Sequence, residues 1–343
     1  MEEDLKKKAI LSLGGAVLLP EGYEPNVRIS HSTAGPGAGF GAIGFKFNGF
    51  SVKKPISHEK GEFELHQRED GSLFLTHGGE PFIDNIEVEP IVRHCPRQAF
   101  FTLDPRCMYH CAYCSSPLLD PKEDKHLTTE RIMEMIHESM KTQEVDCISF
   151  TSGVVGSIDE TVNRFVDVIK AVRNEYPDIP IGVEPYVSSE EHIRRLKEAG
   201  ADEIKLNIEC CNRELFEKIC PDLDYDNIWS MLESAVKIFG KGKVISNIIY
   251  GFGESDDEIE DVLNRLCSMG VVPGVRALRI NNYNRENLTK ALGNTPEKTV
   301  AERALKIAKM QKQAMVRNGM DSMTSKTMCM GCTCCDIVPF VDF

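Results

Sequence analysis

The sequence predicts an α/β protein: a partial (β/α)6 TIM-like barrel, with a small β-rich N-terminal domain before it and a cysteine-rich tail after it. Between residues 96 and 320, six apolar, strand-like segments alternate with amphipathic helical segments. This alternation is typical of a parallel sheet whose strands are joined by right-handed helical crossovers. The predicted strands are 99–103, 147–151, 179–184, 203–208, 244–250 and 274–280, and the predicted domains are 1–95, 96–320 and 321–343.

Local signals also predict where several helices begin and end. Ser188 and Glu191 have the spacing of a capping box, in which the side chain of each residue accepts a hydrogen bond from the backbone amide of the other. Gly200 predicts the end of the same helix, because glycine readily adopts the left-handed conformation that closes a helix. Thr295-Pro296 predicts the start of a long last helix.

The N-terminal region differs in pattern from the rest of the chain. A glycine-rich stretch at 34–41 could be a phosphate cradle, but it lacks the Lys-Ser/Thr of a P-loop and no helical pattern follows it. Close backbone packing in strands and turns is the favoured interpretation. Residues 62–66 and 73–77 alternate apolar and polar side chains around Asp70-Gly71, which predicts a β-hairpin. We expect a β-rich domain that docks a partner or substrate.

Composition limits the classes of function. The chain has 343 residues and a net charge of -13, and no large basic cluster, which argues against nucleic-acid binding. No apolar run is long enough to span a membrane, and the acidic N-terminus is unlike a secretory signal. A cytoplasmic location is expected. The thirteen cysteines are then interpreted as metal ligands and core residues rather than as a disulfide framework.

Cys107, Cys111 and Cys114 follow the first predicted barrel strand within one loop. In such a barrel, functional groups sit at the C-terminal ends of the strands. A closed structural zinc site normally takes four ligands, and this loop offers three. An iron–sulfur cubane held by only three thiolates would keep one iron open for another ligand. A zinc loop is the alternative interpretation.

The spacing of these cysteines, with Tyr113 directly before the last one, resembles the three-cysteine motif of the radical S-adenosylmethionine (SAM) superfamily. The resemblance implies that the three thiolates hold a 4Fe–4S cluster whose open iron is chelated by SAM. It also implies that electron transfer from the reduced cluster cleaves SAM to a deoxyadenosyl radical. An electron donor such as ferredoxin or flavodoxin and an oxygen-sensitive, anaerobic activity are then expected.

The resemblance further implies SAM contacts at the ends of the later strands. The second strand keeps the middle glycine of the family's Gly-Gly-Glu but lacks the acid, and the segment after the fifth strand resembles the Gly-x-Gly-Glu that packs the adenine. The alternative to a SAM contact is a buried structural pair, both for Asn207 and Glu209 of the fourth strand and for Arg276 and Arg279 of the sixth. The expected contacts are Tyr113, Ser152, Gly153, Glu184, Asn207, Glu209, Gly251, Gly253, Arg276 and Arg279.

The tail carries Cys329, Cys332, Cys334 and Cys335, enough thiols for a complete ligand set. Zinc or an auxiliary iron–sulfur cluster would fit, and the absence of histidine favours iron–sulfur. All four are predicted metal ligands. Because adjacent side chains such as those of Cys334 and Cys335 tend to point apart, three tail ligands with an outside ligand or an open iron are the alternative.

The strand-end features most resemble the biotin synthase and lipoyl synthase branch, so we expect C–H activation followed by sulfur insertion from the auxiliary cluster. Peptide or cofactor modification, including methylation, with the tail cluster as an electron conduit is one alternative. A non-catalytic iron–sulfur carrier or scaffold is another. The expected substrate is a small molecule or a protein-bound group, with a partner protein possible and neither nucleic acid nor membrane involved.

Overall fold

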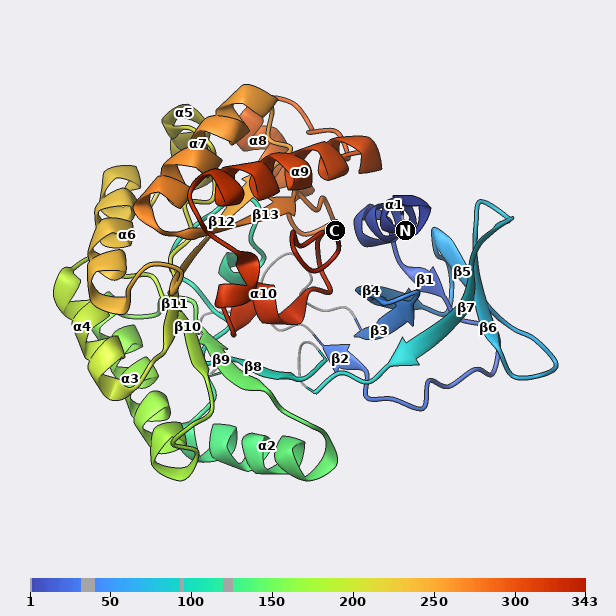
Figure 1. The fold of residues 1–343 in the computed structure, drawn as a ribbon, viewed down its shortest axis with the longest axis horizontal. Helices are drawn as coiled ribbons and strands as arrows, with labels where there is room; N and C mark the ends of the chain where they lie inside the picture. The colour runs from blue at the N-terminus through green and yellow to red at the C-terminus, as the bar shows by residue number, and fades with distance from the viewer. Residues whose placement is uncertain (1, 32–40, 93–95, 120–125) are drawn as a thin grey trace.

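The computed structural model describes residues 2–31, 41–92, 96–119 and 126–343. Its larger part is a six-stranded parallel sheet in the order β13-β12-β11-β10-β9-β8 (Figure 1). Among the described residues, no pairing joins the edge strands β8 and β13, so the barrel is partial, as predicted. The strands are β8 (Gln98–Thr102), β9 (Cys147–Thr151), β10 (Ile181–Glu184), β11 (Glu203–Lys205), β12 (Val244–Tyr250) and β13 (Val272–Ala277).

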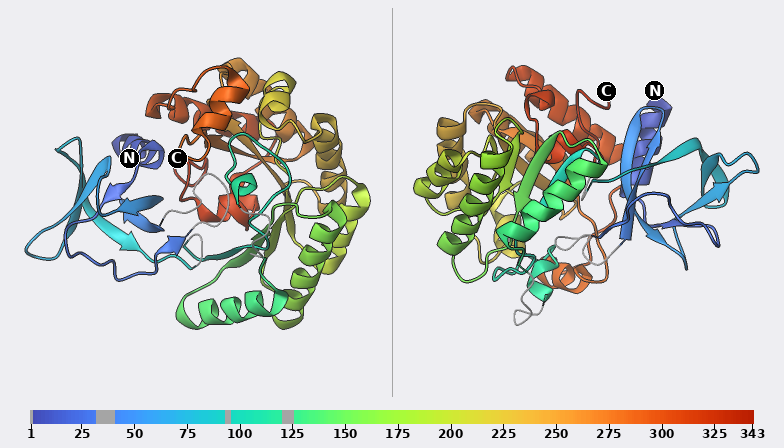
Figure 2. Two further views of the ribbon diagram at one scale, coloured as in Figure 1. Left: turned by 180° about the vertical axis from the view of Figure 1, so that it is seen from behind. Right: turned by 90° about the horizontal axis from the view of Figure 1, so that it is seen from below.

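Helices surround the outer face of this sheet, where they bury the apolar side chains that alternate with inward-facing polar ones (Figures 1 and 2). No helix among the described residues is both long and apolar enough to cross a membrane. The helices are α2 (Thr129–Thr142), α3 (Ile158–Glu175), α4 (Glu190–Ala199), α5 (Arg213–Ile219), α6 (Tyr225–Phe239), α7 (Asp256–Met269), α8 (Arg285–Leu292) and α9 (Ala301–Arg317).

Several predicted bounds were wrong. The third strand begins at Ile181 rather than at residue 179, and the sixth spans Val272–Ala277 rather than 274–280. The fourth strand ends at Lys205 rather than at residue 208, because the Ile208 amide donates to the Ser246 hydroxyl instead of a ladder carbonyl. The N-cap of α4 is Ser189, which accepts from the His192 amide, so the predicted capping box is one residue early. The helix α9 begins at residue 301, well after the expected start at 295–296.

The N-terminal domain combines α1 (Glu2–Leu13) with a seven-stranded sheet in the order β2-β3-β4-β1-β5-β6-β7, plus a β3–β7 pairing. The predicted hairpin is confirmed as the antiparallel pair β5–β6. Most of the glycine-rich stretch, residues 34–40, lies outside the described residues. The strands are β1 (Val17–Leu18), β2 (Ser30–His31), β3 (Gly41–Phe47), β4 (Phe50–Ser57), β5 (Phe63–Gln67), β6 (Leu73–His77) and β7 (Glu80–Glu89).

The tail lies between the barrel and the N-terminal domain, with η2 (Ser322–Thr324) followed by α10 (Met328–Cys332) (Figure 1). Glu203, the first residue of β11, accepts hydrogen bonds from both backbone and side chain of Thr327, at 2.9 and 2.7 Å. Gln98, the first residue of β8, bonds both the amide and the carbonyl of Met328. The tail therefore enters the barrel from the amino-terminal ends of its strands, opposite the end where the Cys107 loop lies.

Two further contacts fix this position. A Cβ on Gly182 in β10 would lie 2.3 Å from the Thr327 hydroxyl oxygen, so only glycine leaves room for the tail there. From the other side, the ammonium of Lys8 in α1 contacts both oxygens of Asp342 at 2.7 Å and the Thr333 carbonyl at 2.9 Å. The tail is thus held by both neighbouring parts of the molecule.

Candidate active site

The loop with the three predicted ligands is held against the end of β9 by backbone contacts. The Met108 amide donates to the Val154 carbonyl, and the Gly153 amide donates to the Asp104 carbonyl, both at 2.8 Å. The buried Asp104 carboxylate pairs with Arg106 at 2.7 Å. A Cβ on Gly153 would lie 1.9 Å from the Arg106 carbonyl oxygen, so the loop requires glycine at this position.

The three thiols of this loop lie close enough to influence one another electrostatically. Burial raises the pKa of Cys107, and it raises the pKa of Cys114 to about 11. The Cys111 thiol hydrogen bonds to Cys220, and this contact together with burial raises the pKa of Cys111 well above its usual value. Cys220 in turn contacts Cys210, so two further thiols lie behind the loop.

The donor set of the loop is of the type that an iron–sulfur cluster takes. No three Cys, His, Asp or Glu side chains among the described residues are arranged to hold a metal ion. In a cubane each iron takes its own thiolate, so the ligands are spread more widely. Three partly exposed thiols on one loop, with no fourth thiol on that loop, match this arrangement.

Four predicted SAM contacts come together beside this loop. The buried hydroxyl of Tyr113 donates to Glu209, and Asn207 bonds both Glu209 and Glu184, the latter at 2.8 Å. Glu184 ends β10, and Asn207 and Glu209 follow β11. Burial raises the pKa of Glu209 to about 7. The carboxyl edge of the sheet thus presents a connected set of polar groups next to the cysteines.

The segment after β12 forms a tight loop on the same edge. Gly251 and Gly253 have φ values of 111° and 121°, a region that favours glycine. The buried Glu254 carboxylate accepts from the amides of Gly251 at 2.7 Å and Phe252 at 2.9 Å, and this fixes the turn. The Phe252 ring lies 6.4 Å from that of Tyr113, so the glycine loop packs against the cysteine loop. Ser152, at the end of β9, donates to the Gly153 carbonyl at 2.8 Å.

The two predicted arginines of β13 and its continuation contact the tail. Arg276 forms an ion pair with Asp336 at 2.7 Å and a hydrogen bond to Cys329. Arg279 donates to the Cys335 carbonyl at 2.9 Å. Their partners therefore lie in the tail and not in the Cys107 loop.

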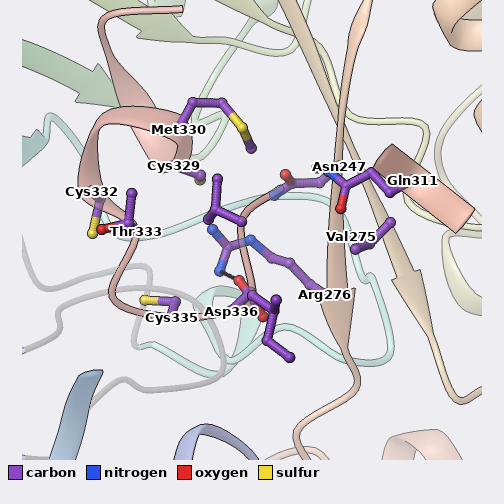
Figure 3. Close-up of a pocket in the computed structure, with 13 residues that line it drawn as sticks. Asn247, Val275, Arg276, Gln311, Cys329, Met330, Cys332, Thr333, Cys335 and Asp336 are labelled. Atoms are coloured by element: carbon purple, nitrogen blue, oxygen red, sulfur yellow. Dashed lines mark ion pairs between the residues drawn. The ribbon is translucent and has the colours of Figure 1, made fainter. Parts of the chain in front are cut away.

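Three of the four tail cysteines, Cys329, Cys332 and Cys335, line one cavity (Figure 3). It contains about 320 Å³ of space not filled by protein atoms, part of it open to solvent. The fourth, Cys334, is buried and does not line it, and its carbonyl accepts from the Lys53 amide of β4 at 2.9 Å. The three lining thiols have the spacing Cys-x2-Cys-x2-Cys.

Polar groups around this cavity fit a bound charged group. The Arg276–Asp336 pair lies beside the thiols, as Figure 3 shows. The side chain of Gln311, a residue only 1% exposed, lines the cavity region, and its oxygen has no hydrogen-bond partner among the described residues. A buried oxygen left unpaired is costly, which is consistent with a missing polar or metal group at this position.

The sequence did not single out Lys205, which proves central to the barrel interior. Its ammonium lies 3.2 Å from the Cys329 sulfur and 2.9 Å from Glu184. Burial lowers its pKa, but Cys329 and Glu184 outweigh burial, so the pKa of Lys205 is raised. The signal available in the sequence was a lysine at an inward-facing position of a strand, which needs a buried acidic partner.

Comparison with known proteins supports the same assignment. Residues 102–266 match the family model described as "Radical SAM superfamily". The chain is 24% identical to the biotin synthase of Macrococcus caseolyticus, over 46% of this chain and 47% of that protein. It is also 24% identical to the lipoyl synthase of Caldicellulosiruptor saccharolyticus, over 50% of this chain and 59% of that protein. The chain thus spans about half the length of these curated relatives.

Two solved structures share the fold. Methylornithine synthase (PylB) superposes with a TM-score of 0.52 at 17% identity, covering 65% of this chain and 69% of that chain. The FeFe-hydrogenase maturase HydG from Carboxydothermus hydrogenoformans gives a TM-score of 0.53 at 18% identity, covering 64% and 52%. The matched region contains the three-cysteine loop and the first five strand ends. Residues 102–266 are therefore similar to the radical SAM superfamily, whose members use a 4Fe–4S cluster and SAM.

Proposed function

We propose that this chain activates a C–H bond of its substrate and inserts sulfur there, using two iron–sulfur clusters. The first would be held by Cys107, Cys111 and Cys114, and the second by the tail. The single observation that carries the proposal is the position of the tail: its thiols lie inside the same barrel whose carboxyl end bears the three-cysteine loop. One chain thus supplies two groups of thiols, one at the carboxyl ends of the barrel strands and one that enters from their amino-terminal ends.

A cluster held by Cys107, Cys111 and Cys114 would supply the electron for the reductive cleavage of SAM. The chain's own residues shape the site for this chemistry. Asp104 and Gly153 fix the loop, and the Glu254 carboxylate holds the glycine turn beside it. We propose that the polar edge containing Glu184 and Asn207 contacts SAM. No acid follows Gly153, so backbone carbonyls at that strand end would accept from the methionyl amine.

The tail site would be held by Cys329, Cys332 and Cys335, while Cys334 would remain a core residue. The chemistry that such a cluster would supply is the sulfur atom of the new C–S bond. Its location within the barrel supports this role, because a sulfur donor must lie within reach of a substrate in the same interior. The low-identity relatives named biotin synthase and lipoyl synthase are consistent with the proposal.

The first experiment tests SAM cleavage. The protein is reconstituted anaerobically and incubated with SAM and dithionite, and then with ferredoxin or flavodoxin as the proposed physiological donors. We expect deoxyadenosine from the wild type and none from a Cys107/Cys111/Cys114→Ala variant that still contains tail iron. An intact loop cluster that yields no deoxyadenosine would favour the carrier or scaffold function instead.

The second experiment tests sulfur insertion. Candidate small-molecule and protein-bound substrates are screened by mass spectrometry for a gain of sulfur, and the tail cluster is followed by Mössbauer spectroscopy during a single turnover. We expect loss of the tail cluster in proportion to product. A tail cluster that survives product formation would reject sulfur insertion and favour the electron-conduit alternative, in which a peptide or cofactor is modified or methylated.

A further inference from the structure

We infer that Lys205 is a positioning residue that sets the reduction potential of the tail cluster and couples it to the SAM-facing edge of the barrel. The inference rests on the proposed tail cluster. Lys205 is 3% exposed, and its ammonium contacts Cys329, one of the three proposed ligands, at 3.2 Å. Arg276 also hydrogen bonds to this sulfur, so Cys329 has two cationic donors. Lys205 is the one of the two that also contacts Glu184 on the SAM-facing edge.

The groups around Lys205 belong to three different strands and the tail. Glu184 on β10 contacts the ammonium at 2.9 Å. With the Asn247 amide on β12 oriented so that its oxygen faces the cations, that oxygen accepts from Lys205 at 2.9 Å and from the Arg276 Nε at 3.0 Å. The ammonium is thus held in one place by an acid, an amide and a sulfur, and cannot reorient freely.

A fixed positive charge at a ligand sulfur has a defined effect on a cluster. Reduction adds one negative charge, which a nearby cation stabilises, and a hydrogen bond to the sulfur acts in the same direction. Lys205 should therefore raise the reduction potential of the tail cluster. Burial strengthens the effect, because little water is present to screen the charge.

Glu184 should act in the opposite direction through the same contact. Its negative charge partly offsets that of Lys205, and its carboxylate also accepts from Asn207 on the carboxyl edge. Asn207 leads on through Glu209 to Tyr113 in the three-cysteine loop. A continuous series of side-chain contacts thus connects Cys329 to the SAM-facing residues, so a charge change at one end alters the field at the other.

The test uses a background in which only the tail cluster can form, the Cys107/Cys111/Cys114→Ala variant of the full chain. In this background, Lys205→Met, Lys205→Arg and Glu184→Gln are compared by anaerobic, EPR-monitored redox titration. Lys170→Met, at an exposed position on α3, is the control for loss of a distant lysine. Iron and labile sulfide are measured for every variant.

We expect Lys205→Met to lower the midpoint potential by at least the 59 mV that corresponds to a tenfold change in a one-electron equilibrium constant. Lys205→Arg should retain most of the wild-type potential, Glu184→Gln should raise it, and Lys170→Met should leave it unchanged. Opposite shifts at Lys205 and Glu184 would not arise from a merely structural role, because loss of packing has no preferred sign.

Two outcomes overturn the inference and are distinguishable from failure of the proposed function. If the background variant contains no iron–sulfur cluster, the proposed tail cluster is wrong. If the cluster is present and Lys205→Met leaves its potential unchanged, or Glu184→Gln shifts it in the same direction as Lys205→Met, the role of Lys205 alone is wrong. If the Lys205→Met variant loses the cluster, the Glu184→Gln and Lys205→Arg variants still test the inference. A midpoint potential of Glu184→Gln at or below that of the background protein refutes it.

Discussion

Replacing Lys8 by methionine should destabilise the whole molecule, because this lysine joins α1 to the tail. Its side chain is fully buried, and that of its partner Asp342 is 3% exposed. The ammonium contacts both carboxylate oxygens at 2.7 Å and also the Thr333 carbonyl. The Lys8→Met variant leaves a buried carboxylate and a buried carbonyl without their cationic donor.

The magnitude follows from this burial. Breaking a buried ion pair by removing one partner costs about 3–5 kcal/mol of unfolding free energy, because the remaining charge is uncompensated. Native domains have only about 5–15 kcal/mol in total. Adding Asp342→Asn removes that charge and keeps a side-chain oxygen for the Val338 amide, which donates to Asp342 at 2.7 Å. The double variant should therefore recover at least half of the loss.

The assay is anaerobic urea unfolding of the reconstituted protein, combined with limited proteolysis of the tail. Lys306→Met is the matched control, because Lys306 forms an ion pair of the same 2.7 Å length with Asp256 but is mostly exposed. Exposed pairs contribute little, so this variant should unfold close to the wild type. A Lys8→Met variant as stable as the Lys306→Met control, or no recovery with Asp342→Asn, would refute the reasoning.

Three further predictions concern the two thiol sites and the pH dependence. Cys332→Ala should lose the tail iron and Cys334→Ala should retain it, because Cys332 lines the cavity and Cys334 does not. Iron and sulfide are measured for each substitution in the Cys107/Cys111/Cys114→Ala background. Equal iron contents in the two variants would contradict the prediction. Gly153→Ala should displace the cysteine loop, because the added Cβ would lie 1.9 Å from the Arg106 carbonyl oxygen. The displacement misplaces the reacting groups, so the rate of deoxyadenosine formation should fall by about 100-fold. A rate within a factor of two of the wild-type rate would contradict the prediction. Burial raises the pKa of Glu209 from 4.5 to about 7, so the folded state binds this proton more tightly and stability falls as the pH rises from about 4.5 through 7. Glu209→Gln should remove this loss of stability, which is about 3 kcal/mol of unfolding free energy at pH 8. The unfolding free energies of the wild type and the variant are measured at pH 5 and pH 8. Equal losses between the two pH values in the two proteins would contradict the prediction.

Much of the barrel could be predicted because its strands carry local signals. The second and fifth strands were predicted with their observed bounds, since each is a short apolar run between helical segments. The end of the fourth strand was predicted incorrectly. The Ile208 amide donates to the Ser246 hydroxyl instead of to a backbone carbonyl of the neighbouring strand, and the sequence of neither strand gives a signal for this contact. The predicted start of α9 was wrong because Pro296 permits a helix to start at that position but does not require it.

The three-cysteine loop was predictable from spacing alone, whereas the place of the tail was not. The tail is fixed by contacts between residues far apart in sequence, such as Glu203 with Thr327 and Lys8 with Asp342. Each is an ordinary charged or polar residue in its own segment, so no periodicity identifies its partner. That Asp336 is the partner of Arg276 could not be predicted for the same reason, although a charge within an apolar strand did indicate an ion pair as the alternative to a SAM contact.

The charges around the tail cavity give an independent reason to expect an anionic group there. Three cations face this region: Lys205 pairs with Glu184 and Arg276 with Asp336, but among the described residues Arg279 has no carboxylate within ion-pair distance and donates only to a carbonyl. An excess of partly buried positive charge is unfavourable, and it is unexpected inside a chain whose net charge is -13. Thiolates bound to a metal cluster are anionic and would offset this excess. The charges around the cavity therefore support the proposed tail cluster.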